Sequence, residues 1–308
     1  MRILVIKLSA LGDVVLALGP FAAIRAHHPG AHVTLLTTKG FVDFTRHMPW
    51  FDEVWQDERP SGPAGLLRLA RRLRAGRFDR VYDLQTSGRS SRYRLLVGGR
   101  PEWSGIARGA SHPHSNPLRD SMHTLERQRE QLEMAGIHDF PPPDLGWLDA
   151  DLSHLGLPER FAALVPGASP SRPAKRWPHF PALAALLPLP SVVVGGPSEA
   201  PLARAVRAER PDAIDLTGRT SLFELAALLR RAAFTVGNDT GPTHLAAAVG
   251  SPTLTLFGAD SDPALTAPRG DRAASLQRLP LDSLDPAAVM TALRGLDVLP
   301  APSPSAPP

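Results

Sequence analysis

The sequence predicts an α/β protein built from two Rossmann-like domains that face each other across a cleft. Along both halves of the chain, short apolar runs alternate with helical patterns, which is typical of parallel sheets covered by helices. A proline-rich stretch at residues 140–144 interrupts the alternation before it starts again. With 308 residues, of which 43% are hydrophobic, the chain can bury two cores. We therefore expect an N-terminal domain over residues 1–150, a C-terminal domain over 151–298 and an unstructured tail over 299–308.

The first half opens with a strand–loop–helix unit. We expect a buried strand at residues 3–6 and an apolar helix at residues 14–26. Apolar runs at 33–37 and 81–84 predict two further strands, and the amphipathic segment 65–74 predicts a helix. Ligands are expected at the carboxyl ends of such strands.

The second half repeats this order. Strands are expected at residues 161–165, 191–194, 234–236 and 253–257. Helices are expected at residues 180–187, 199–210, 222–231 and 243–248. A last helix at 286–296 follows Asp285, a favourable N-cap, and has Pro286 at its first position.

The composition excludes several kinds of site. The sequence has no cysteine, which removes disulfides, cysteine-ligated zinc, iron–sulfur clusters and cysteine nucleophiles. Its three lysines are Lys7, Lys39 and Lys175, and none precedes Ser or Thr, so the P-loop pattern is missing from the sequence. No apolar run approaches the roughly 20 residues of a membrane-spanning helix, and no export signal is visible. We therefore expect a cytoplasmic protein.

Asp13 lies in the loop that leaves the first strand, within residues 7–13 (KLSALGD). One interpretation is that its carboxylate caps the helix that follows. The other is that it acts as a general base, because a carboxylate on a loop that lines a cleft can accept a proton from a substrate hydroxyl.

Lys175 lies just after the first strand of the second domain, in residues 166–178 (PGASPSRPAKRWP). A lysine next to an arginine on a strand-to-helix loop can bind a diphosphate leaving group. A solvated surface pair is the alternative.

A third motif, residues 236–248 (VGNDTGPTHLAAA), leads from a strand through a glycine-containing turn into a helix. The first turn of a helix offers free N–H groups and the positive end of a dipole to an anion. The motif lacks the G-x-G-x-x-G pattern, so a nicotinamide cofactor is disfavoured. A plain capped helix is the alternative interpretation.

These motifs belong to three longer segments: RILVIKLSALGDVVLALGPFAAIR, PGASPSRPAKRWP and VGNDTGPTHLAAAVGSPTLTLFG. In their order and spacing they resemble glycosyltransferase family 9, the lipopolysaccharide heptosyltransferases, over residues 1 to about 298. The resemblance implies a GT-B fold with an acceptor-binding N-terminal domain and a nucleotide-sugar-binding C-terminal domain. It also implies ADP-heptose as the donor and inversion at the anomeric carbon without a metal ion or other cofactor.

The resemblance further implies roles for individual residues. Asp13 matches the family's catalytic base. The positions that match the donor-binding residues are Ser169, Lys175, Asp239, Thr240, Gly241 and His244. Among them, Ser169 and Lys175 correspond to contacts with ribose and phosphates, and Asp239 corresponds to a contact with the donor sugar. Thr240, Gly241 and His244 lie where the helix N-terminus receives the diphosphate.

We expect no metal site. The two Asp-x-Asp pairs, at 149–151 and 260–262, lie in the linker and downstream of the last expected strand. His112, His114 and His123 have no carboxylate at a matching helical spacing.

The positive charge of the chain is concentrated in its first half. Residues 1–150 contain 20 basic and 16 acidic residues, against 14 and 14 in the remainder. Within the helix expected at 65–74, Arg68, Arg71 and Arg72 share one face, and Leu66, Leu67, Leu69 and Leu73 are expected on the buried side. This arrangement favours docking on anionic lipid, with a solvated face as the alternative. The family resemblance implies that this lipid is a glycolipid acceptor at the inner face of the inner membrane. No aromatic residues are interleaved, so we expect no nucleic-acid partner.

Three functions fit these observations. The first is an inverting, metal-independent glycosyltransferase that acts on a lipopolysaccharide core or a related glycolipid. The second is a non-catalytic module that binds anionic glycolipid. The third is an NAD-linked oxidoreductase on the same sheet architecture, which the missing glycine pattern disfavours.

Overall fold

The computed structural model describes residues 1–169 and 171–299 of the chain. The chain forms two compact units, Met1–Trp147 and Leu148–Pro308. The predicted boundary lay at residue 150, in the segment that follows Trp147. The proline-rich stretch leads to Trp147, whose ring packs 5.3 Å from Phe44 and 6.3 Å from Trp50 between ring centroids. Residues 140–147 therefore end on the N-terminal unit.

The N-terminal unit has a six-stranded parallel sheet in the order β3-β2-β1-β4-β5-β6. The strands are β1 (Arg2–Ile6), β2 (His32–Thr38), β3 (Glu53–Asp57), β4 (Arg80–Asp83), β5 (Glu102–Gly105) and β6 (His112–Pro113). The helices are α1 (Leu11–Val15), α2 (Leu18–His27), α3 (Lys39–Arg46), α4 (Pro63–Ala75), α5 (Gly88–Val97) and α6 (Thr124–Glu133). This order of strands is that of a dinucleotide-binding Rossmann sheet.

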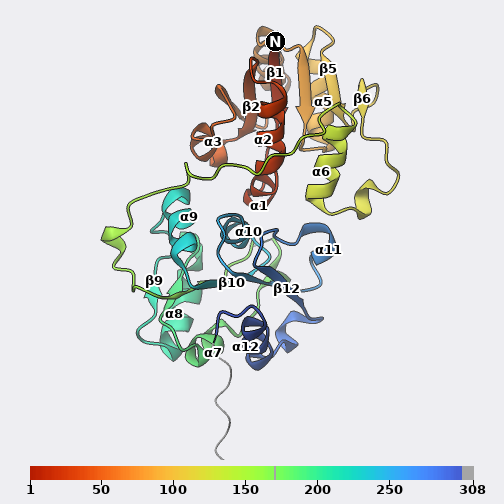
Figure 1. The fold of residues 1–308 in the computed structure, drawn as a ribbon. Helices are drawn as coiled ribbons and strands as arrows, with labels where there is room; N and C mark the ends of the chain where they lie inside the picture. Colours follow the sequence, from red (N-terminus) through yellow and green to blue (C-terminus); the bar gives the residue numbers. More distant parts are fainter. Residues whose placement is uncertain (170, 300–308) are drawn as a thin grey trace, which may run out of the picture. The chain divides into compact units, whose positions relative to one another are not determined.

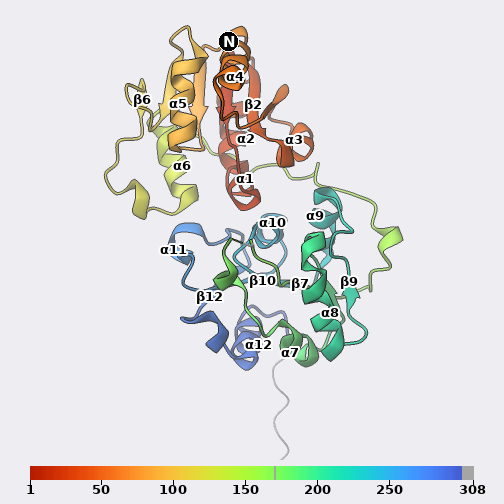
Figure 2. The same cartoon turned by 180° about the vertical axis from the view of Figure 1, so that it is seen from behind.

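The two faces of this sheet bury alternate residues of β1, as the pleat requires. Leu4 and Ile6 pack with Leu69 and Leu73 of α4 in one apolar cluster. On the opposite face lies α2, in front of the sheet in Figure 1, whereas α4 and α5 are in front in Figure 2.

The C-terminal unit repeats the same topology, with the order β12-β11-β10-β7-β8-β9 and all neighbours parallel. Its strands are β7 (Ala162–Val165), β8 (Ser191–Val193), β9 (Ile214–Asp215), β10 (Phe234–Asn238), β11 (Thr253–Phe257) and β12 (Ala273–Gln277). Its helices are α7 (Phe180–Leu186), α8 (Ala200–Glu209), α9 (Leu222–Arg231), α10 (Gly241–Ala248), α11 (Pro263–Thr266) and α12 (Pro286–Gly295). Residues of α7, α8 and α12 share one core with the strands, while α9 and α10 lie over the other face (Figure 1).

The two Rossmann-like units confirm the predicted α/β class. Several elements differ from the prediction. The expected helix at 14–26 is two helices, α1 and α2, and α1 already begins at Leu11. Pro20 explains the division, because proline is tolerated only in the first turn of a helix and here occupies the third position of α2.

The C-terminal end of the described chain also differs. Leu299, where the tail was predicted to begin, is buried in the core of the C-terminal unit, and the remaining predicted tail, residues 300–308, lies outside the described residues. The Asp-x-Asp pair at residues 260–262 was predicted to lie beyond the last strand. This prediction was wrong, because β12 follows the pair. Within residues 1–169 and 171–299, none of the helices has the length and apolar character to span a bilayer.

Candidate functional site

Lys175, Asp239 and His244 form one connected group at the carboxyl end of β10, which we call the donor-side cluster. The Nζ of Lys175 lies 2.6 Å from Oδ2 of Asp239, and Nε2 of His244 lies 3.2 Å from Oδ1. Asp239 and His244 are buried, and Lys175 is half-buried. Burial alone would favour the neutral acid, but the hydrogen bonds and charges of His244 and Lys175 lower the pKa of Asp239 to about 2. Asp239 is therefore an anion at physiological pH.

The turn between β10 and α10 holds this cluster in place. Thr240 is the N-cap residue of α10, and its carbonyl accepts the N–H groups of Thr243 and His244 at 3.1 and 3.2 Å. Gly237 is required at the end of β10, because a Cβ there would lie 2.4 Å from Oγ1 of Thr243 and 2.7 Å from Cβ of Val165. The first turn of α10, with Gly241 as its first residue, presents the positive end of the helix next to Lys175 and Asp239.

Asn238 was not predicted as a functional residue, but it connects the loops of this site. Its Nδ2 donates to the carbonyls of Pro166 and Gly167 at 2.9 and 3.1 Å, and its Oδ1 accepts the N–H of Trp177 at 3.1 Å. The side chain is fully buried. Asn238 thus fixes the loop after β7 and the end of the loop that carries Lys175 relative to β10.

Glu199 is a second residue that the sequence interpretation missed. Its Oε2 accepts the N–H of Gly196 at 2.7 Å, and a Cβ at Gly167 would lie 1.6 Å from its Oε1. The carboxylate therefore rests against the loops that follow β7 and β8. An acidic residue shortly after the second strand of a Rossmann unit is the signal that could have identified it.

The predicted donor residue Ser169 is exposed and lies apart from the hydrogen bonds of the donor-side cluster. Its Oγ lies 2.8 Å from Oγ of Ser171, and its carbonyl accepts the N–H of Arg172 at 2.9 Å. In the described part of this loop, which omits residue 170, no hydrogen bond joins Ser169 to Lys175.

In the N-terminal unit, Asp13 is the third residue of α1 and is half-buried. Its Oδ2 accepts the N–H of Ala10, the N-cap residue, at 2.9 Å, which is the contact that the third residue of a helix makes in a capping box. Among the residues that the structure describes, Oδ1 accepts no hydrogen bond. The arrangement thus includes the capping contact and leaves one carboxylate oxygen able to accept a proton.

The loop before Asp13 is fixed by β4 and by the segment that follows it. The Oε1 of Gln85 accepts the N–H groups of Leu8 and Ser9 at 2.8 and 3.3 Å. Lys7 is buried and donates from Nζ to the carbonyl of Leu84 at 3.2 Å. Burial lowers the pKa of Lys7, and the negative charge of Asp13 opposes this shift. Lys7 is thus one basic neighbour of Asp13.

Arg127 of α6 is another basic neighbour of Asp13. Burial and the nearby Arg119 lower the pKa of Arg127, whereas the carboxylates of Asp120 and Asp13 act in the opposite direction. Basic groups directly after β1 and on α6 therefore share the surroundings of Asp13.

Arg59 reaches the same loop from the segment after β3, where its Nη2 donates to Oγ of Ser9 at 2.8 Å. The buried Asp57 holds this segment. Its Oδ1 accepts the N–H of Arg59 at 2.8 Å, and its Oδ2 accepts the hydroxyl of Tyr93 at 2.7 Å. Burial and the hydrogen bond to Asp57 raise the pKa of Tyr93 to about 12, so the phenol stays a donor. The sequence interpretation did not identify Arg59, Asp57 or Tyr93.

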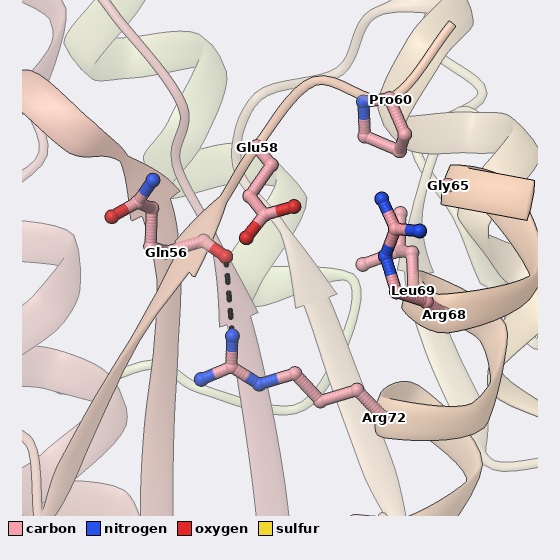
Figure 3. A pocket seen from close by; sticks show the side chains of 7 residues that line it. All are labelled: Gln56, Glu58, Pro60, Gly65, Arg68, Leu69 and Arg72. Carbon is pink, nitrogen blue, oxygen red and sulfur yellow. Dashed lines mark hydrogen bonds between the residues drawn. The ribbon is translucent and has the colours of Figure 1, made fainter. Parts of the chain in front are cut away.

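The predicted arginine face lies on α4, beside a hollow of about 100 Å³ that Arg68 and Arg72 line together with Glu58 (Figure 3). Arg72 is not simply solvated, because its Nη1 donates to the carbonyl of Gln56 at 3.3 Å and its guanidinium stacks 4.6 Å from the centre of the Trp55 ring. Arg71 is exposed.

The buried side of α4 differs in part from the prediction. Leu69 and Leu73 are buried as expected, but Leu66 and Leu67 are 39% and 49% exposed. The face that packs on the sheet is narrower than a pattern of four leucines implies.

The three histidines considered for a metal each lie beside a different carboxylate. His114 pairs with Glu130 at 2.7 Å, His123 with Glu126 at 3.1 Å, and His112 lies 3.7 Å from Glu102. Glu126 follows His123 by three residues, so the prediction that no carboxylate lies at a helical spacing was wrong for this histidine. Asp262 caps α11 by accepting the N–H of Ala264 at 2.8 Å. Apart from residues 170 and 300–308, the chain contains no group of three His, Asp or Glu side chains placed to hold a metal ion.

Comparison with known proteins shows consistent similarity. The family model for glycosyltransferase family 9 (heptosyltransferase) matches residues 66–281. Lipopolysaccharide heptosyltransferase 1 of Salmonella typhimurium is 28% identical over 289 residues, which cover 86% of this chain and 90% of that protein. Lipopolysaccharide heptosyltransferase 3 of Escherichia coli is 22% identical over 80% of this chain and 81% of its own length.

Solved structures show the same fold, which confirms the predicted GT-B type. A family 9 glycosyl transferase from Veillonella parvula superposes with a TM-score of 0.80 at 23% identity, over 96% of both chains. The E. coli heptosyltransferase WaaC, solved with ADP, gives a TM-score of 0.75 at 23% identity, over 96% of this chain and all of that one.

Proposed function

Since this chain belongs to glycosyltransferase family 9 (heptosyltransferase), we propose that it transfers a heptose from ADP-heptose to a lipopolysaccharide core or a related glycolipid. The chain is a glycosyltransferase, and the donor, the acceptor and the chemistry are our proposals. The relatives named above are lipopolysaccharide heptosyltransferases, and their similarity to this chain extends over most of their length. This similarity supports the choice of substrates.

The donor-side cluster carries the proposal. A departing nucleoside diphosphate gains negative charge, which a preorganised cation and a helix N-terminus can stabilise. The Oδ2 of Asp239 and, at 3.5 Å, its backbone carbonyl take two of the three donor positions of the Lys175 ammonium, so one remains for a phosphate oxygen. Thr240 and Gly241 begin α10 and supply its positive end, and His244 keeps Asp239 in place from the other side. Asp239, held as an anion, accepts hydrogen bonds from hydroxyl groups of the donor sugar.

The nucleoside is assigned to the loops after β7 and β8. A carboxylate after the second strand of a Rossmann unit binds the ribose hydroxyls of a nucleotide. Glu199 occupies this place, against Gly167 and Gly196, and its second oxygen can accept from the ribose. Ser169, exposed after β7, is assigned a contact with the donor's ribose or phosphates.

We assign the base to Asp13. Its free Oδ1 accepts the proton of the acceptor hydroxyl, whose oxygen then forms a bond to the anomeric carbon as the bond to the nucleoside diphosphate breaks. One such displacement from the opposite face inverts the anomeric centre. The basic side chains near Asp13 and its loop, namely Lys7, Arg59 and Arg127, suit an acceptor that carries phosphate or carboxylate groups.

In this proposal Lys175 and the positive end of α10 provide the counter-charge that a metal ion would otherwise supply, so the reaction is metal-independent and no cofactor takes part. A peripheral position at the inner membrane is also part of the proposal, because a glycolipid acceptor lies in a membrane and Arg68 and Arg71 give α4 a positive exposed face.

A transfer assay tests the function. The full chain is incubated with a heptose-free lipopolysaccharide-core acceptor and either ADP-heptose or UDP-glucose, and the acceptor is analysed by mass spectrometry. We expect the acceptor to gain one heptose from ADP-heptose and no sugar from UDP-glucose. A product with UDP-glucose alone would overturn the donor assignment, and no transfer from either donor would overturn the function.

A further inference from the structure

A hollow of about 280 Å³ lies in the C-terminal unit at the edge of the sheet opposite to the donor-side cluster. Arg160 stands two positions before β7, Ala233 directly before β10 and Arg272 directly before β12. Arg231 is the last residue of α9. Because the strands are parallel, the residues that precede them lie together at the amino ends of the strands. There they line the hollow together with Asp297 and Val298. We call it the arginine hollow.

The arginine hollow has an excess of positive charge that its unit as a whole does not have. Residues 151–308 contain 14 basic and 14 acidic residues, yet three arginines and one carboxylate line this hollow. Arg272 donates from Nη2 to the carbonyl of Leu296 at 3.0 Å. The guanidinium groups of Arg160 and Arg231 have neither an ion pair nor a hydrogen bond to any described residue.

The nearby carboxylates do not compensate for this charge. Glu159 and Asp271, the sequence neighbours of two of the arginines, do not line the hollow. In the described chain, no ion pair joins Asp297 to an arginine. The unbalanced charge therefore faces the solvent-filled space itself.

An adjacent hollow of about 370 Å³ provides a contrast. It shares Arg231 and is also lined by Arg230, Asp149 and Asp151, so two arginines face two carboxylates there. Arg230 also donates to the carbonyl of Leu148 at 2.8 Å. The lining of that hollow is balanced, whereas three arginines and one carboxylate line the arginine hollow, with Arg231 common to both.

We propose that the arginine hollow binds a small anion that carries phosphate, such as a phosphomonoester or a diphosphate. Guanidinium groups from three segments can each donate paired hydrogen bonds to phosphate oxygens, which is the geometry that arginine provides best. The concave shape suits a free anion that enters the hollow, rather than the surface of a membrane. This site is separate from the proposed donor site and does not rest on the proposed function.

Calorimetry of the full chain with pyrophosphate tests the site. Arg160→Ala/Arg231→Ala removes the two unpaired guanidinium groups. Arg204→Ala/Arg207→Ala is the matched control, since both arginines are exposed on α8, outside the hollow, and the charge change is the same. We expect the first variant to lose one pyrophosphate site of the wild type, with at least a tenfold fall in affinity there, and the control to keep it.

Further arms separate this site from other sources of binding. Lys175→Ala is titrated in parallel, so that any pyrophosphate bound at the donor-side cluster is identified independently. Equal pyrophosphate binding by the arginine variant, the control and the wild type would overturn the proposal. The proposal would also be overturned if Arg160→Ala/Arg231→Ala kept pyrophosphate binding but no longer sedimented with vesicles of anionic phospholipid. The partner would then be a lipid surface. Unchanged thermal midpoints ensure that folded proteins are compared.

Discussion

Asp13 has a capping contact and a proposed catalytic role, and one substitution can separate them. The Asn side chain of Asp13→Asn keeps an oxygen that accepts the N–H of Ala10, so α1 stays capped. The amide cannot act as a general base, however. We expect turnover to fall about 10²- to 10⁴-fold, with an unchanged thermal midpoint and unchanged ADP affinity.

The companion variant Asp13→Ala removes both roles. It should lose turnover to the same extent and also lose about 1 kcal/mol of stability, the usual net value of one hydrogen bond. If Asp13→Asn transfers sugar at nearly the wild-type rate, Asp13 is a helix cap only and another group must accept the proton.

Lys175 connects the donor-side cluster to the leaving group. Removing one charge-assisted hydrogen bond to a phosphate costs about 1.5–3 kcal/mol, so Lys175→Ala should bind ADP roughly 10- to 100-fold more weakly by calorimetry. Lys39→Ala is the matched control, because Lys39 is an exposed lysine of the N-terminal unit. Equal ADP affinity in the two variants would contradict the assignment of Lys175.

The low pKa of Asp239 makes the stability of the cluster depend on pH. The folded value of about 2 lies below the ordinary value of about 3.9 for an unfolded chain. The ionised carboxylate therefore stabilises the folded state above about pH 4, and this contribution is lost as the pH falls toward 2. We expect the difference in unfolding free energy between wild type and Asp239→Asn, measured in urea, to be constant above pH 5 and to shrink between pH 4 and 2. A difference that stays constant over that acid range would show that Asp239 is not held as an ion.

The sequence was most informative for residues whose role follows from their place after a buried strand. Asp13, Lys175 and Asp239 all follow such strands, and the structure does bring Lys175, Asp239 and His244 into contact. Asn238 and Glu199 act through contacts with loops distant along the chain, such as the carbonyl of Pro166, and no local pattern reveals those contacts. The pair of Asp57 and Tyr93 is hidden for the same reason, because 36 residues separate its members.

At the scale of elements, burial decided which strands were predictable. β1, β7 and β10 are buried almost throughout and appear in the sequence as apolar runs. The missed strands are β3 and β12 at sheet edges, β5 next to the short edge strand β6, and the two-residue strands β6 and β9. The ends of β3 are Glu53 and Asp57, so its polar termini hide a short segment centred on the buried Trp55.

The helix α4 leads to a prediction about membranes. Arg68 and Arg71 are exposed, whereas Arg72 is held by Trp55 and Gln56, so the first two are the suitable targets. Arg68→Glu/Arg71→Glu should reduce sedimentation with anionic vesicles, and added salt should reduce wild-type sedimentation in the same way. ADP affinity should not change.

The control for this experiment is Arg204→Glu/Arg207→Glu, which makes the same charge change on α8 of the other unit. If both double variants sediment with vesicles as the wild type does, the arginines of α4 form a solvated face. The membrane part of the proposal would then be dropped.

At the scale of the whole molecule, the same strand order occurs twice in one chain, and the sequence predicted this repetition because strand and helix patterns restart after the proline-rich stretch. Each unit places its candidate residues at the carboxyl ends of its central strands, where Rossmann sheets bind ligands. The end of the N-terminal unit at Trp147 was harder to predict, because it depends on the packing of this ring against Phe44 and Trp50.

The most direct test of the account is the anomeric configuration of the product. The protein is treated exhaustively with EDTA, incubated with ADP-heptose and a lipopolysaccharide-core acceptor, and the new linkage is analysed by nuclear magnetic resonance. The account predicts a transferred heptose whose anomeric configuration is inverted relative to the donor, formed at the same rate before and after chelation. A retained configuration, or activity that is lost with EDTA and restored by Mg²⁺, would contradict a single displacement supported by Asp13, Lys175 and the N-terminus of α10.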